Sequence, residues 1–107
     1  CFHISLICDV SPNCDCHSEN DIPIVPNVGM LASFDPVALD VACADLVNQQ
    51  PIINKSILEE QSHQLGHCHH EENDYFKMTH PNTNWKSGIE HAEKIGLGTS
   101  QYQLIEL

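Results

Sequence analysis

The alternation of apolar and polar residues predicts a strand near the start of the chain. Over residues 2–10, "FHISLICDV", apolar residues occupy every second position, and Ile7 is the one apolar residue among the positions between them. Successive side chains of a strand point to opposite faces, so this pattern is typical of a half-buried strand. The face expected to be buried carries Phe2, Ile4, Leu6, Cys8 and Val10. Two further strands are predicted, a fully buried one in the apolar run 28–33 and another at 101–107.

A helix is predicted at 36–49. Asp35 is a favourable N-cap, Pro36 suits the first helical position, and Pro51 follows as a stop. Apolar residues cover almost the whole circumference, so we expect this helix to be buried on most sides. Asp40 is the exception, because an ionised carboxylate on a buried helix is costly unless it is paired or hydrogen-bonded.

Three shorter helical segments are expected later in the chain. They lie at 55–62, just before Pro81, and from Trp85 to a stop at Gly96, which suits the left-handed position after a helix. Strands at both ends around central helices predict an α/β or α+β fold, a small three-stranded sheet with helices packed against it. The length fits a single domain over residues 1–107, expected to be the C-terminal fragment of a longer protein.

Net charge excludes several classes of partner. The chain has a formal charge of −11, and its basic residues are four lysines. Without arginine or a basic surface, neither nucleic acid nor an anionic membrane is an expected partner. The longest apolar run, 41–44, is far shorter than the roughly 20 residues that cross a bilayer.

The six cysteines are compatible with a disulfide framework or with reduced thiols. A disulfide framework compensates for a thin core, whereas 41% of this chain is hydrophobic. Cys14 and Cys16 also lie too close in sequence for a bond between them to remove much entropy from the unfolded chain. We therefore expect reduced cysteines and a cytoplasmic location, with Cys8 and Cys43 in the core.

The stretch "NCDCH" at 13–17 is a candidate metal site in a loop rich in proline and asparagine. Zinc and iron–sulfur centres prefer thiolate and imidazole ligands, and a tetrahedral zinc site takes four of them. Two segments offer such ligands: Cys14, Cys16, His17, His67, Cys68, His69 and His70. In the alternative, Cys14 and Cys16 are thiols packed under the loop, and the His-rich tract takes up metal only adventitiously.

Other catalytic motifs are weak or absent. Asp35 is explained by its capping role, whereas Asp40 has either a partner at a site or a structural backbone hydrogen bond. No G-x-S-x-G, P-loop or dinucleotide fingerprint is present. A nucleophilic cysteine–histidine pair is not singled out by any spacing.

Four stretches together resemble the C-terminal part of a family known as domain of unknown function DUF362. They are "CDC" at 14–16, "PIVPNVGMLASFDPVALDVACADLV" at 23–47, "HPNTNW" at 80–85 and "AEKIGLGTSQYQLIEL" at 92–107. The resemblance implies an iron–sulfur-centre protein in which a ferredoxin-type four-cysteine module is embedded in a larger chain. Only Cys14 and Cys16 transfer, because the run C-x2-C-x2-C-x3-C is absent and the His-rich tract has no counterpart in the family.

The leading functional hypothesis is a metal- or iron–sulfur-associated binding module of a larger cytoplasmic redox-type protein. Zinc or an iron–sulfur cluster is the expected cofactor, and a [4Fe–4S] cluster is expected only in the N-terminal remainder of the protein. That remainder and a redox partner are the expected partners. One alternative is a small-molecule enzyme domain with a pocket near Asp40 and the Cys14/Cys16 loop, and another is a purely structural domain.

Overall fold

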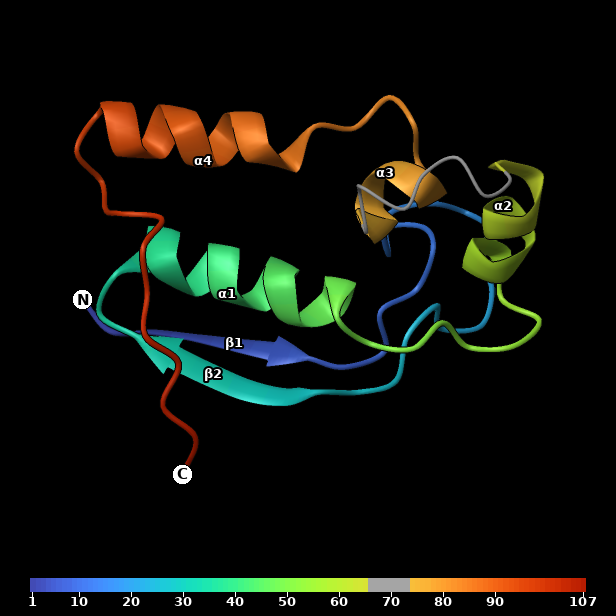
Figure 1. Ribbon diagram of the computed structural model, residues 1–107, viewed down its shortest axis with the longest axis horizontal. Coiled ribbons are helices and arrows are strands. Elements are labelled where there is room, and N and C mark those ends of the chain that lie inside the picture. The colour runs from blue at the N-terminus through green and yellow to red at the C-terminus, as the bar shows by residue number, and fades with distance from the viewer. Residues whose placement is uncertain (66–73) are drawn as a thin grey trace.

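The structure, a computed structural model, describes residues 1–65 and 74–107. Its elements are strands β1 (His3–Ile7) and β2 (Gly29–Ser33) and helices α1 (Pro36–Asn48), α2 (Ile57–Leu65), α3 (Tyr75–Thr79) and α4 (Trp85–Lys94). Helix α1 lies between the sheet and α4, whereas α2 and α3 gather beyond one end of the sheet (Figure 1). The mixed α/β character is therefore confirmed.

The two strands pair antiparallel, with His3 opposite Ser33 and Ile7 opposite Gly29. The predicted third strand does not form, since residues 101–107 have no regular secondary structure and are exposed. The segment contacts α1 instead. The Tyr102 hydroxyl donates a hydrogen bond of 2.7 Å to Asp45 Oδ2, which ties this segment to α1.

The face of β1 that contacts α1 is the opposite of the predicted one. Ile7 is buried, whereas Ile4 and Leu6 are 59% and 69% exposed. On the helix side of the strand, the Ser5 hydroxyl hydrogen-bonds the Cys43 thiol of α1. The expectation of a fully buried strand at 28–33 is also wrong, since Met30 is largely exposed.

Helix α1 begins as its sequence predicts. Asp35 Oδ1 accepts hydrogen bonds from the backbone N–H groups of Val37 (2.9 Å) and Ala38 (3.1 Å). Most of the helix is buried or half-buried between the sheet and α4. Asp40, however, is exposed, so its carboxylate needs no buried partner.

Helix α4 ends at the predicted stop. Gly96 has a φ of +80°, and the backbone N–H groups of Gly96 and Leu97 donate to the carbonyls of Glu93 (3.1 Å) and Ala92 (2.9 Å). This pattern is the Schellman motif that favours glycine. At the other end, Asn84 occupies the N-cap position without a side-chain capping hydrogen bond.

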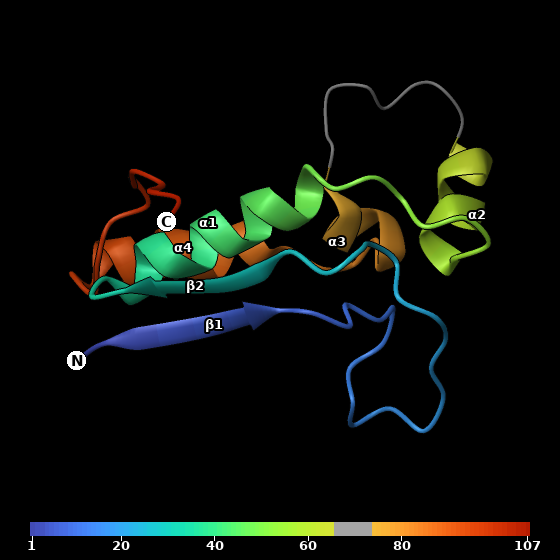
Figure 2. The ribbon, with the colours of Figure 1, turned by 90° about the horizontal axis from the view of Figure 1, so that it is seen from below.

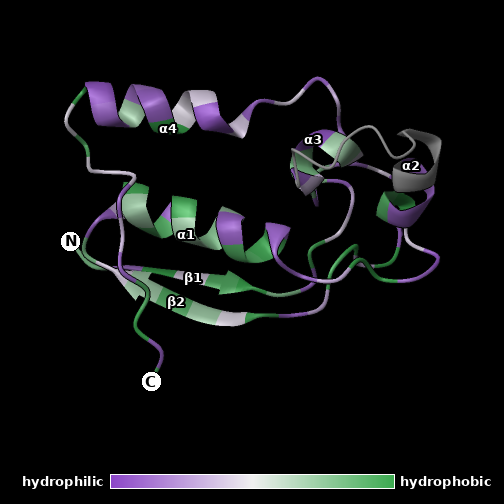
Figure 3. Cartoon of the chain, in the orientation of Figure 1, coloured by the Kyte–Doolittle hydropathy of each residue, from purple (hydrophilic) through white to green (hydrophobic). Residues whose placement is uncertain are grey.

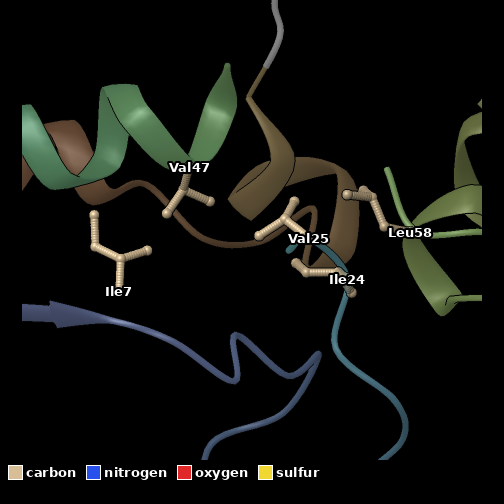
Figure 4. Close-up of a cluster of buried hydrophobic side chains, with 5 residues drawn as sticks. All are labelled: Ile7, Ile24, Val25, Val47 and Leu58. Atoms are coloured by element: carbon tan, nitrogen blue, oxygen red, sulfur yellow. The ribbon is translucent and has the colours of Figure 1, made fainter. Parts of the chain in front are cut away.

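The best-buried apolar cluster joins four parts of the chain (Figure 4). Its members are Ile7 in β1, Ile24 and Val25 in the β1–β2 loop, Val47 in α1 and Leu58 in α2. Because two of the five come from the loop, the core itself fixes the segment that follows "NCDCH".

Candidate functional site

The loop that carries Cys14 and Cys16 has a fixed base. The backbone N–H of Ile24 donates to the Val10 carbonyl (2.8 Å), and that of Val28 donates to the Ile7 carbonyl (2.9 Å). Asp9, with a φ of +48°, donates its N–H to Asn27 Oδ1 at 2.8 Å. From this base the loop extends away from the strands (Figure 2). The cysteine pair is therefore held at a distance from α1 and α4.

Two asparagines close the loop around the cysteine pair. The Asn20 amide donates to the carbonyl of Asn13 (3.0 Å) and to the Ser11 hydroxyl (3.1 Å), and its Oδ1 accepts from the Asn13 N–H (3.2 Å). The Asn13 amide in turn donates to the Glu19 carbonyl at 3.1 Å. These bonds bring residues 13 and 20 together, so the six residues between them form a closed hairpin-like turn.

Cys14 and Cys16 lie on one tight turn, closed by a 2.9 Å hydrogen bond from the His17 N–H to the Cys14 carbonyl. Both side chains are exposed, which does not support the alternative of thiols packed under the loop. The backbone N–H and the thiol of Cys16 hydrogen-bond the Cys14 sulfur and lower the pKa of Cys14. The same thiol–thiol hydrogen bond raises the pKa of Cys16. The same turn therefore shifts the pKa values of its two thiols in opposite directions, downward at Cys14 and upward at Cys16.

The other predicted ligands do not complete a site in the described part of the chain. The His17 ring contacts the Glu19 backbone, with Nδ1 3.0 Å from its carbonyl oxygen. Among the side chains that the structure describes, in residues 1–61 and 74–107, no group of three or more histidine, cysteine or acidic residues could hold a metal ion. His67, Cys68, His69 and His70 lie outside the described residues. The two thiols of this turn alone do not fit a [4Fe–4S] cluster, which takes four cysteines.

The two cysteines predicted to lie in the core differ from each other. Cys8 is exposed, because β1 ends at Ile7 and the chain turns at Asp9. Cys43 is half-buried on α1, and burial raises the pKa of its thiol.

A groove of about 470 Å³ lies where the loop base meets α3 and the start of α4. Its apolar lining comes from Val10, Pro12, Ile24, Phe76 and Trp85. His80 Nε2 lies 2.5 Å from the Pro12 carbonyl oxygen and links α3 to the loop base. Asp40 does not line this groove, so the pocket expected near Asp40 is not found there. No local sequence pattern indicates this groove, because its walls come from three separate segments of the chain.

Comparison with known protein families gives a match for the first part of the chain. Residues 1–45 match the family model Domain of unknown function (DUF362). The DUF362 match covers β1, the whole cysteine loop, β2 and most of α1. It confirms the family resemblance over these residues, whereas the stretches at 80–85 and 92–107 lie outside it.

No curated protein and no solved structure matches the chain. Among the helices of residues 1–65 and 74–107, none combines the length and apolarity that a membrane span requires.

Proposed function

We propose that the chain is a metal-binding module in which Cys14 and Cys16 supply two thiolate ligands to a zinc ion. The observation that carries the proposal is the placement of two exposed, hydrogen-bonded thiols on a single tight turn. A tetrahedral zinc ion needs further ligands. We assign these to His67, Cys68, His69 and His70, or to the N-terminal remainder of a larger redox-type protein.

The chemistry of the turn suits a soft or borderline cation. Zinc binds the deprotonated form of cysteine, and the hydrogen bonds that lower the pKa of Cys14 make its deprotonation easier. Binding of the cation then displaces the proton of Cys16. The charge of −11 on the chain, with Asp15 inside the turn, favours accumulation of cations around the loop.

The fixed loop base supports the same proposal. Ile24 and Val25 are buried in the core, and the asparagine pair closes the loop below the turn. A preorganised pair of ligands loses less conformational entropy when it binds a metal. An iron–sulfur cluster belongs, in this proposal, to the N-terminal remainder and not to these two thiols.

Titration of the reduced chain with zinc and with Co²⁺ tests the proposal. Co²⁺ bound by thiolate gives an intense sulfur-to-metal absorption that imidazole or carboxylate ligands do not produce. We expect this band in the parent chain, together with tight zinc binding that strengthens from pH 6 to pH 8 as protons are released, as thiolate ligation requires, by about tenfold or more.

Two variants identify the ligands. Cys14→Ser combined with Cys16→Ser should abolish the Co²⁺–thiolate band and tight zinc binding. Alanine at His67, His69 and His70 together should only weaken zinc binding. The matched control is Cys8→Ser combined with Cys43→Ser, which removes the same number of thiols from outside the turn and should leave both readouts unchanged. If the Cys14/Cys16 variant binds zinc as tightly as the parent, the turn is not a metal site.

A further inference from the structure

One face of the sheet is apolar, uncharged and exposed. The register places Ile4 opposite Ala32 and Leu6 opposite Met30. At the end of the sheet nearest the N-terminus, the rings of Phe2 and Phe34 contact each other, with centroids 5.0 Å apart. We call this surface the open sheet face, and it consists of Phe2, Ile4, Leu6, Met30, Ala32 and Phe34.

The open sheet face points away from the helices. Both α1 and α4 lie on the same side of the sheet (Figure 1). Ser5 and Ile7, which alternate with the open-face residues, are the ones that meet α1 and the core. The five large side chains of the face are between 56% and 78% exposed. Most of β1 is hydrophobic along its length (Figure 3), so both of its faces carry apolar residues.

The size of the open sheet face matches that of a protein interface. Five side chains of this size, each more than half exposed, present on the order of 600 Å² of apolar surface. Monomeric proteins rarely expose a contiguous apolar patch larger than a few hundred Å². A standard-size complex buries about 800 Å² on each partner, so the apolar surface of the face amounts to most of the area that such an interface needs.

We propose that the open sheet face is the interface between two copies of the chain, packed face to face about a two-fold axis. In such a contact each copy presents the same patch. With the axis across the middle of the strands, the phenyl rings at one end of each face pack on Leu6 and Met30 at the other end of the partner face. Ala32, at the centre, leaves room for Ile4. The two faces are therefore complementary in size as well as in polarity.

Charge favours this arrangement over other ways for two copies to meet. None of the fifteen acidic residues belongs to the open sheet face. Two chains of charge −11 repel each other, and contact through an uncharged face keeps their carboxylates in water and away from one another.

Sedimentation of the 107-residue chain over a range of concentrations tests the proposal. We expect a mass that rises from monomer to dimer with concentration, and a dimer that tightens as salt screens the repulsion between the two copies. A chain that stays monomeric up to about 500 µM would overturn the proposal, since a specific interface of this area binds more tightly than about 1 mM. That outcome would assign the face to another occupant, such as the N-terminal remainder.

Two lysine variants locate the interface. Ile4→Lys places a charge at the centre of the face and should weaken dimerisation by at least about tenfold. Leu97→Lys is the matched control, because Leu97 is 58% exposed against 59% for Ile4, lies outside the face, and receives the same charge. Both variants make the chain less negative, so loss of the dimer cannot arise from added repulsion.

The fold of each variant is checked by circular dichroism at a concentration where the parent is monomeric. Met30→Lys, on the neighbouring strand, is the second test variant if Ile4→Lys fails to fold. Equal dimerisation of the parent, the open-face variants and Leu97→Lys would place the contact elsewhere and overturn the proposal.

Discussion

Leu58 packs α2 against the core, and its truncation gives a direct test of the packing in Figure 4. Its side chain is 0% exposed and belongs to the same cluster as Ile24 and Val25 in the cysteine loop. Leu58→Ala removes three carbon atoms, and at about 0.8 kcal/mol for each the lost transfer free energy is about 2.4 kcal/mol. The cavity left behind raises the expected loss of folding free energy to about 3–5 kcal/mol.

That loss is a large part of the total, because a domain of this length has a free energy of unfolding of about 5–15 kcal/mol. Urea unfolding followed by circular dichroism measures it, and with a slope of about 1–2 kcal/mol/M the midpoint should fall by about 1.5 M or more. The control is Leu97→Ala, where an exposed leucine is removed and the change should stay within about 0.5 kcal/mol. A loss below about 1 kcal/mol for Leu58→Ala would refute the packing of α2 against the loop.

Three further expectations concern single ionisable side chains. Backbone N–H groups, that of Thr99 first, lower the pKa of Asp35 in the folded chain. The stability that they confer is present above the ordinary pKa of about 4 and is lost as the pH falls through the lower folded value. Thermal melts from neutral to acidic pH should therefore show a steeper loss for the parent than for Asp35→Asn. In metal-free protein near neutral pH, Cys14 should react with iodoacetamide faster than Cys43, whose pKa is raised by burial, as peptide mass spectrometry would show; faster labelling of Cys43 would contradict the described exposure. Asp40→Asn should change the unfolding free energy by less than about 0.5 kcal/mol, because Asp40 is exposed, and a large loss would contradict this placement.

The helices could be predicted from the sequence because their signals are local. Asp35 and Pro36 define the start of α1, and Gly96 defines the end of α4, through bonds to residues only a few positions away. Helix capping depends on neighbouring backbone groups, so it can be predicted without knowledge of the tertiary fold. The prediction of a third strand was wrong for the opposite reason, because strand pairing is not a local signal. Pairing of residues 101–107 required a distant partner, and the bond from Tyr102 to Asp45 on α1 holds the segment elsewhere.

The orientation of the sheet was not predictable from alternation alone. A period of two separates the residues of β1 into two faces, but it does not say which face meets the helix. The prediction assigned the more apolar face to the core. In the structure, Ile7 and Ser5 face the core and α1, and the apolar face containing Ile4 and Leu6 is left exposed.

The candidate site was predictable only in part. The spacing of Cys14 and Cys16 identified a pair of neighbouring thiols, and a short turn necessarily keeps them close. Their opposite pKa shifts arise from hydrogen bonds within the turn, and the closure of the loop by Asn13 and Asn20 depends on side-chain contacts that the spacing does not reveal. Ligation by the His-rich tract stays a prediction, since residues 66–73 lie outside the described part of the chain.

The cysteine turn and the open sheet face belong to one continuous segment of the chain. The hydrogen-bonded base of the loop lies between them. The backbone hydrogen bonds from Ile24 to Val10 and from Val28 to Ile7 close the loop at its base, between the end of β1 and the start of β2. A change at the cysteine turn would reach the sheet through this base, where Ile24 and Val25 are buried in the core. Zinc binding and dimerisation should accordingly be independent, because coupling between two sites requires an element with two alternative arrangements. We expect the backbone bonds and core contacts of the loop base to hold both strands in the same register with and without a metal on the thiols.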